Sequence, residues 1–235
     1  MSDKVPTRKP ATADVDAFLN KVAAIPKRNS GAARGRLLFA MDATASRQPT
    51  WDRAANLQGE MFTATSALGG LDVQLAFFRG FGEFKVSHWT DDTSELLRLM
   101  TSVNCFAGET QIGKVLRHAL NETTRRRVNA LVYVGDSMEE DIDILGKLAG
   151  ELGLNGVPAF MFLEGADPIA EYAFKEMARL SGGACARFDA GSAEMLKKLL
   201  GAVAVYAAGG HRALSDLANR QGGAILSLTH QLNKD

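Results

Sequence analysis

The fold is decided by Leu37-Leu-Phe-Ala-Met41, which is followed at once by Asp42-Ala-Thr-Ala-Ser46. The first stretch is a continuous apolar run, which is typical of a strand buried on both faces. The second holds one carboxylate and two hydroxyl groups. Open α/β sheets bind ligands beyond the carboxyl ends of their strands. A polar loop directly after a buried strand is therefore a candidate binding site.

The rest of the chain alternates short apolar runs with longer segments of helical period. This pattern predicts strands covered by helices on both faces. Strands are expected over 37–41, 73–78, 83–88, 130–134, 157–163 and 184–188. Helices are expected over about 57–68, 92–100, 112–120, 145–152, 168–180 and 192–206. The expected fold class is α/β, Rossmann-like, with a mostly parallel six-stranded sheet.

The segment after the fifth expected strand has clear signals for both ends of a helix. Asp167 can cap the first turn, and Pro168 fits the first helical position because its missing N–H has no partner there in any case. Ser181-Gly-Gly183 predicts the end of the helix. The buried stripe is expected to consist of Ile169, Ala173, Met177 and Leu180.

Composition shifts divide the chain into three parts. Residues 36–209 form the expected domain. Residues 1–35 hold a basic linker and one expected amphipathic helix, whose apolar residues are Val15, Phe18, Leu19 and Val22. Residues 210–235 form a C-terminal extension with enough apolar residues to pack on the domain or on a partner.

The charge balance argues against two classes of partner. The 235 residues include 27 Lys+Arg and 27 Asp+Glu, for a formal net charge of zero. The chain therefore lacks the general attraction that nonspecific binders of nucleic acid or anionic membrane use.

The N-terminal segment lacks a signal-peptide pattern, and no apolar run approaches the roughly 20 residues of a spanning helix. We expect a cytoplasmic protein without a nucleic-acid or membrane partner. Cys105 and Cys185 lack zinc-site spacing.

Two further polar loops accompany the first. Gly108-Glu-Thr110 precedes an expected helix, and Gly135-Asp136-Ser137 follows the strand over 130–134. The three loops together offer two carboxylates and three hydroxyls, an oxygen-only set that suits Mg²⁺ or Mn²⁺. Hydroxyls fill coordination positions without neutralising the ion, which stays attractive to an acidic group from another molecule. The candidate metal ligands are Asp42, Thr44, Ser46, Thr110 and Asp136.

The same residues carry a resemblance to a known family. Asp42-x-Thr44-x-Ser46, then Thr110, then Asp136 resemble, in order, the metal-ion-dependent adhesion site (MIDAS) of von Willebrand factor type A (VWA) domains. The resemblance covers about 36–209 and is closest to stand-alone, bacterial-type cytosolic VWA proteins. It implies a VWA fold, direct metal binding by the hydroxyls, and Asp42 and Asp136 acting directly or through water. It also implies a partner protein that supplies a Glu or Asp to the metal, and no catalysis.

Three positions depart from the family pattern. Thr44 replaces a serine, Glu109 replaces a frequent glycine, and Gly135 replaces a frequent threonine. Two other functions therefore stay open: a metal-assisted phosphohydrolase that uses the same cluster, and a scaffold with a vestigial metal site. Each polar residue also has a purely structural interpretation as a helix cap, and the acids over 139–143 are expected to stabilise the first turns of their own helix.

Overall fold

The fold is described by a computed structural model over residues 34–47, 71–188 and 201–207. Its strands are β1 (Gly35–Asp42), β2 (Leu71–Arg79), β3 (Glu83–Val86), β4 (Ala130–Gly135), β5 (Ala159–Glu164) and β6 (Ala184–Phe188). Its helices are the short 3-10 turn η1 (Ala45–Arg47), α3 (Thr93–Thr101), α4 (Ile112–Arg125), α5 (Ile142–Leu154) and α6 (Pro168–Ser181), and residues 201–207 are also helical. The expected helices near Val15 and over 57–68, much of the last expected helix, and the C-terminal extension lie outside the described residues.

The six strands form one sheet in the order β3-β2-β1-β4-β5-β6. All neighbouring pairs are parallel except β2 and β3, which form an antiparallel hairpin. The predicted mostly parallel, six-stranded α/β sheet is therefore confirmed. β1 lies at the centre, and Met41 is in register with Val134 of β4.

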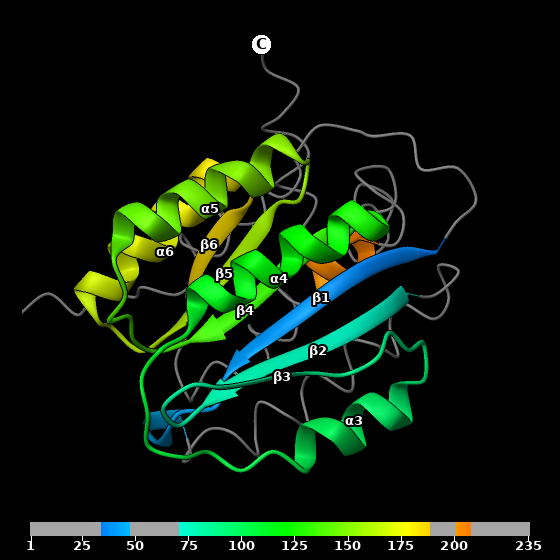
Figure 1. Cartoon of the computed structure of the whole chain (residues 1–235), viewed down its shortest axis with the longest axis horizontal. Coiled ribbons are helices and arrows are strands. Elements are labelled where there is room, and N and C mark those ends of the chain that lie inside the picture. The colour runs from blue at the N-terminus through cyan, green and yellow to red at the C-terminus, as the bar shows by residue number, and fades with distance from the viewer. Residues whose placement is uncertain (1–33, 48–70, 189–200, 208–235) are drawn as a thin grey trace, which may run out of the picture.

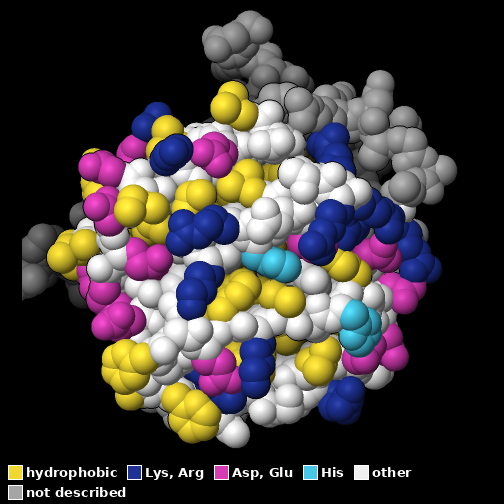
Figure 2. Space-filling model, in the orientation of Figure 1, with side chains coloured by type: hydrophobic (Ala, Val, Ile, Leu, Met, Phe, Trp, Pro, Cys, Tyr) yellow, Lys and Arg dark blue, Asp and Glu magenta, His cyan; other side chains and the backbone are white. Residues whose placement is uncertain are grey.

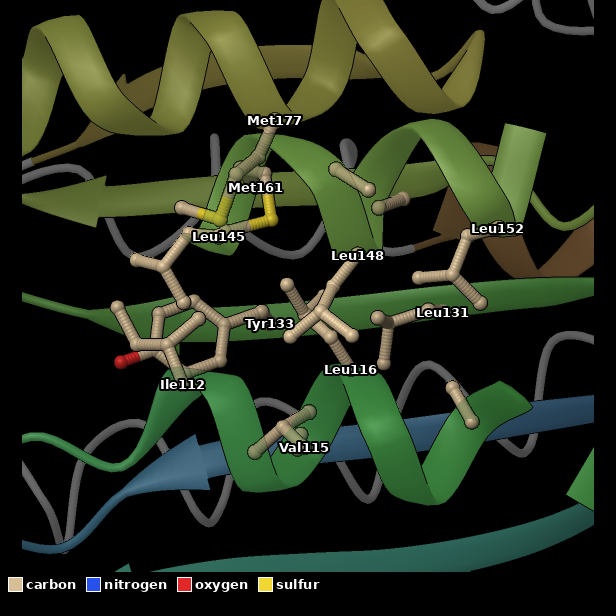
Figure 3. Packing of buried hydrophobic residues seen from close by; sticks show 14 of the residues in the cluster. Ile112, Val115, Leu116, Leu131, Tyr133, Leu145, Leu148, Leu152, Met161 and Met177 are labelled. Carbon is tan, nitrogen blue, oxygen red and sulfur yellow. The ribbon is translucent and has the colours of Figure 1, made fainter. Parts of the chain in front are cut away.

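Side chains that alternate along the buried strands build a core on each face of the sheet. Figure 1 shows α4, α5 and α6 together over one face. Leu37 and Phe39 pack in the core that includes residues of α3 and of 201–207. Leu38 and Ala40 face the other core, which lies beneath α4, α5 and α6 (Figure 3). None of these helices, within the described part of the chain, is long and apolar enough to cross a membrane.

Helix α6 begins and ends as expected but buries a different stripe. Asp167 caps it by accepting hydrogen bonds from two backbone N–H groups, and Gly182 ends it in a left-handed conformation. Ile169 is 64% exposed and Leu180 is 37% exposed, so the prediction that both are buried is wrong. The buried residues are Ala170, Ala173, Phe174, Met177, Ala178 and Ser181. The packed face is centred on Phe174, whose ring lies edge-on to Tyr133.

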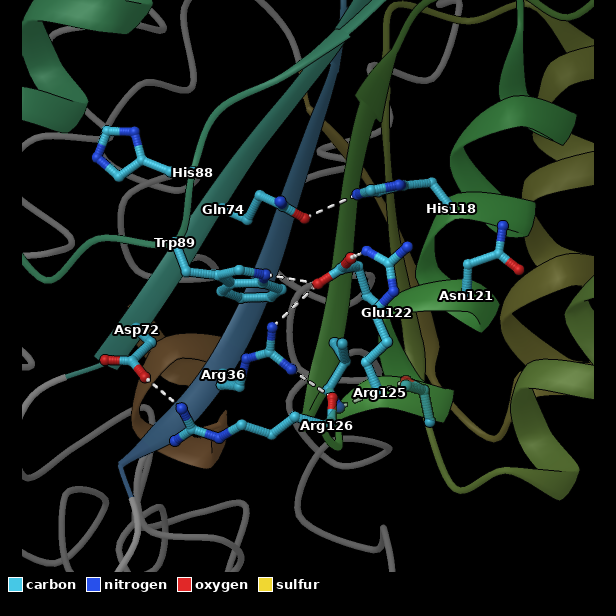
Figure 4. A network of polar contacts seen from close by, with 12 residues as sticks. Arg36, Asp72, Gln74, His88, Trp89, His118, Asn121, Glu122, Arg125 and Arg126 are labelled. Atoms are coloured by element: carbon cyan, nitrogen blue, oxygen red, sulfur yellow. Dashed lines mark hydrogen bonds and ion pairs between the residues drawn. The ribbon is translucent and has the colours of Figure 1, made fainter.

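A buried polar network lies at the end of the sheet where β1 begins (Figure 4). The Arg36 guanidinium lies 3.7 Å from the centroid of the Trp89 ring. Arg36 Nη2 and Trp89 Nε1 both donate to Oε2 of Glu122, at 3.1 Å and 2.7 Å. This network joins β1 to the segment after β3 and to the last turns of α4. It therefore fixes the end of α4 that lies away from the candidate site.

We expect Glu122→Gln to lower the free energy of unfolding by about 3–5 kcal/mol, because it leaves the buried Arg36 charge without its carboxylate. Burial raises the pKa of Glu122, but hydrogen bonds from Trp89 and Arg36 outweigh burial and hold that pKa below its ordinary value. The stabilisation is therefore present at neutral pH and is lost as pH falls through the lowered pKa.

Urea unfolding at several pH values measures this effect. The matched control is Glu176→Gln, which removes an exposed ion pair with Arg179 and should change the free energy of unfolding far less. Equal losses in the two variants would contradict a special role for the network.

Candidate metal centre

Asp42 ends β1 and is completely buried. Its Oδ1 accepts a hydrogen bond of 2.7 Å from the backbone N–H of Thr44, which turns the chain out of the strand. None of the described residues donates a hydrogen bond to its Oδ2. A buried carboxylate oxygen that lacks a donor is costly in free energy, so this oxygen is suited to a cation or a water molecule.

Thr44 and Ser46 present their hydroxyl groups together, just beyond Asp42. Thr44 is buried and Ser46, in η1, is exposed. Their Oγ atoms lie 3.2 Å apart. That separation is close to the roughly 3 Å between neighbouring oxygens around an octahedral Mg²⁺ with bonds of about 2.1 Å. The pair therefore joins a buried position to a solvent-facing one.

The parallel register brings Asp136 to the same edge. Because Met41 pairs with Val134, the ends of β1 and β4 are adjacent, and Asp136 directly follows β4.

Burial raises the pKa of Asp42 to about 6, and the negative charge of Asp136 adds to that increase. Hydrogen bonds from Thr44 and the positive charge of Arg47 act in the opposite direction.

Thr110 is held against the loop that follows β4. Its backbone N–H donates to Oε2 of Glu139 at 2.8 Å, and its Oγ1 accepts from the Glu139 backbone N–H at 3.1 Å. Thr110 is buried and is not the cap of α4, because the N-cap position is Gln111, whose side chain makes no capping bond. The structural interpretation of Thr110 as a helix cap is therefore wrong.

The acidic residues after Asp136 cap two helices: α5, which follows them in the chain, and α4, which precedes them. Asp141 caps α5, as its sequence position suggests. The Glu140 carboxylate instead accepts from the backbone N–H groups of Ile112 and Gly113, at the start of α4. Glu139 and Glu140 precede α5, so the expectation that they lie in its first turns is wrong. The reason is that the start of α4 has no side chain of its own to cap it, and the neighbouring loop supplies one.

The absence of a side chain at position 135 has a steric explanation in this chain. A Cβ atom at position 135 would lie 2.6 Å from the Tyr133 hydroxyl and 2.9 Å from its ring. Figure 3 shows this ring in the core beside Ile112, with its hydroxyl directed toward the end of the sheet. Tyr133 is fully buried, and no described residue makes a hydrogen bond with its hydroxyl. Burial raises the pKa of Tyr133, and the charge of Asp42 raises it further.

Sequence reasoning missed Tyr133 and Arg47. Arg47 is 1% exposed and forms an ion pair with Glu164 at the end of β5. It directly follows the Asp42–Ser46 motif, and a lone basic residue in that position is the only signal the sequence offers. Glu109 is exposed, so it does not fill the buried part of the site.

The structure thus brings Thr44 into contact with both Asp42 and Ser46, and places Asp136 after the neighbouring strand end. It fixes Thr110 through Glu139 rather than through Asp42. Among the described residues, no three His, Cys, Asp or Glu side chains gather into a metal-binding group. A cation at this edge would therefore depend on the hydroxyl groups as well as the carboxylates.

We expect the metal-free chain to lose stability as pH rises from about 4 to about 7. The pKa of Asp42 is about 6 in the folded chain and about 3.9 in an unfolded one, so the folded state binds the proton more tightly. The pKa difference of about two units corresponds to a loss of about 3 kcal/mol. Urea unfolding in EDTA should show a loss in the unmodified chain that is about 3 kcal/mol larger than in Asp42→Asn, where the smaller contribution of Glu140, whose pKa burial also raises, remains. The control variant Asp72→Asn, at the opposite end of the sheet, should retain the full loss; if Asp42→Asn retains the full loss too, Asp42 is not its source.

Comparison with solved structures identifies the fold. The chain matches the crystal structure of the SpRpn10 VWA domain with a TM-score of 0.58 and 16% identity, over 72% of this chain and 94% of that one. It matches the PilB minor pilin from Streptococcus sanguinis with a TM-score of 0.57 and 12% identity, over 83% of this chain and 65% of the pilin. It matches proximal thread matrix protein 1 from the mussel byssus with a TM-score of 0.55 and 11% identity, over 72% of this chain and 45% of that protein.

At the level of sequence, no protein-family model and no curated protein matches the chain. The assignment therefore rests on the sheet order, the two helical layers and these structural matches. The chain contains a domain with the von Willebrand factor type A fold.

Proposed function

We propose that the chain is a protein-interaction module that binds an acidic residue of a partner through Mg²⁺ or Mn²⁺. The observation that carries the proposal is the buried Asp42 carboxylate, whose Oδ2 receives no hydrogen bond from the described residues. The residues that would hold the ion are Asp42, Thr44, Ser46, Thr110 and Asp136.

Each of these residues has a distinct role in the proposal. Asp42 and Asp136 supply the negative charge, directly or through water. The hydroxyls of Thr44, Ser46 and Thr110 supply neutral oxygens, as Mg²⁺ sites require several oxygen ligands. The ion would then keep enough positive charge to attract a further carboxylate. Ser46 is exposed, so a partner can approach from its side.

The proposal is for binding rather than catalysis. Thr44 stands two residues after Asp42, where a phosphoryl-transfer enzyme with a catalytic aspartate would need an acid. The neighbours of this fold include a VWA domain and a pilus adhesin from Lactobacillus rhamnosus. These relationships are distant, and they support a binding role without naming a partner.

The first test is metal binding. With a Kd below about 1 mM, about 10 mM Mg²⁺ or Mn²⁺ should stabilise the chain by at least 1.4 kcal/mol or so, and raise its melting temperature. Metal binding should also remove the pH dependence that Asp42 causes in EDTA. Asp42→Asn should lose the stabilisation, and Asp72→Asn should keep it. Absence of binding heat in calorimetry at these concentrations would favour the vestigial scaffold instead.

The second test is metal-dependent capture of a partner. Pull-downs from lysate are compared in Mg²⁺, in EDTA and with Asp42→Ala. We expect a protein that is retained only by the unmodified chain in Mg²⁺. Identical capture under all three conditions would exclude metal-dependent recognition.

A further inference from the structure

Two aromatic side chains are exposed at the edge of the sheet that holds the candidate metal centre. Phe81, at the turn between β2 and β3, is 83% exposed, and Phe106, in the loop after α3, is 51% exposed. Figure 2 shows large hydrophobic side chains on the surface at this edge, where β1 and β2 end. Large rings exposed near each other mark a candidate contact surface for a partner.

The backbone places Phe106 next to the metal ligands. Phe106 pairs with Thr44 in an isolated parallel bridge, and its N–H donates to the carbonyl of Ala43 at 3.0 Å. If a partner's carboxylate bound an ion held by Thr44, another side chain a few residues away in the same partner segment could contact the Phe106 ring.

The turn that carries Phe81 is packed against the same loop. A Cβ atom at Gly108 would lie 2.1 Å from the carbonyl oxygen of Gly80, so the two backbones are in direct contact. The N–H of Glu109 points to that same carbonyl at 3.4 Å. The turn that carries Phe81 and the loop that carries Phe106 thus lie side by side.

Arg79 fixes the orientation of Phe106. Its guanidinium lies 4.4 Å from the centroid of that ring and is itself held by Glu83, at 2.8 Å and 3.2 Å, and by the carbonyl of Asn104 at 2.8 Å. A side chain held in this way loses little conformational entropy when a partner binds.

Lys114 contributes a positive charge beside Phe81, while the exposed Glu109 lies on the loop that packs against the same turn. The Lys114 ammonium donates to the carbonyl of Gly82 at 2.9 Å and to Oε1 of Gln111 at 2.8 Å, which are both neutral acceptors. No carboxylate forms an ion pair with Lys114 among the described residues, in contrast to Arg79. The charge beside Phe81 is therefore available to a negatively charged partner.

We infer that Phe81, Phe106 and Lys114 form a docking surface for an acidic, apolar peptide segment of a partner protein. The segment would place one carboxylate on the metal and one large apolar side chain, a few residues away, on the two rings. This inference rests on the proposed function and adds the chemistry of the segment that is recognised. Phe81→Ser/Phe106→Ser removes the rings, and Leu154→Ser is the control, since Leu154 is 87% exposed at the far end of α5.

The test is selection of random heptapeptides displayed on phage by the immobilised full chain in Mg²⁺. We expect enrichment of peptides with an Asp or Glu within about three residues of Leu, Ile, Met or Phe. An enriched peptide, labelled with a fluorophore, should bind about tenfold or more weakly to the double variant, and with unchanged affinity to Leu154→Ser. Metal affinity, measured by calorimetry, should be the same in all three chains.

Several results would overturn the inference: no enriched peptide, enrichment without a nearby apolar residue, or equal binding to the double variant. Concentration-dependent dimers in sedimentation velocity that the double variant abolishes would also overturn it, because the rings would then bind a second copy of the chain. The proposed function fails separately: if Asp42→Asn binds the peptide as well as the unmodified chain and the double variant does not, the docking surface remains and the metal role is excluded.

Discussion

The buried carboxylate of Asp42 is the constraint on which the end of the sheet depends. The central strand delivers a negative charge to a position without solvent, and only Oδ1 receives a donor from the described residues. Three neighbouring features accommodate the Asp42 carboxylate. Thr44 turns back to donate to it, Arg47 contributes a positive charge from the next turn, and Gly135 leaves room for the Tyr133 hydroxyl beside it.

Much of this arrangement was predictable from the sequence because its signals are local. The apolar run over 37–41 identified the central strand, and Asp167-Pro168 identified the start of α6. The positions of Asp42, Thr44 and Ser46 followed from the rule that parallel strands present their carboxyl ends at one edge. The order of motifs then indicated the VWA fold, which the solved structures confirm.

The parts that were not predictable depend on contacts between distant segments. Nothing near Ile112 indicates that its N–H is capped by Glu140, because the two residues meet only after β4 and α4 have packed together. Ile169 and Leu180 are exposed because α6 packs through the face that holds Phe174, and a helical period does not specify which of two neighbouring apolar stripes meets the sheet. The burial of Arg47 likewise depends on Glu164, more than a hundred residues away.

The contact between Tyr133 and Gly135 has a consequence for the evolution of this domain. A Cβ atom at position 135 would collide with the Tyr133 side chain, so a larger residue at 135 requires a smaller one at 133, whereas a smaller residue at 133 is compatible with Gly135. A sequence that carries a threonine at position 135 would have to carry a smaller side chain at position 133. Relatives of this chain are therefore expected to carry Thr at position 135 only together with a small residue at position 133, and to keep Gly at 135 wherever Tyr stands at 133.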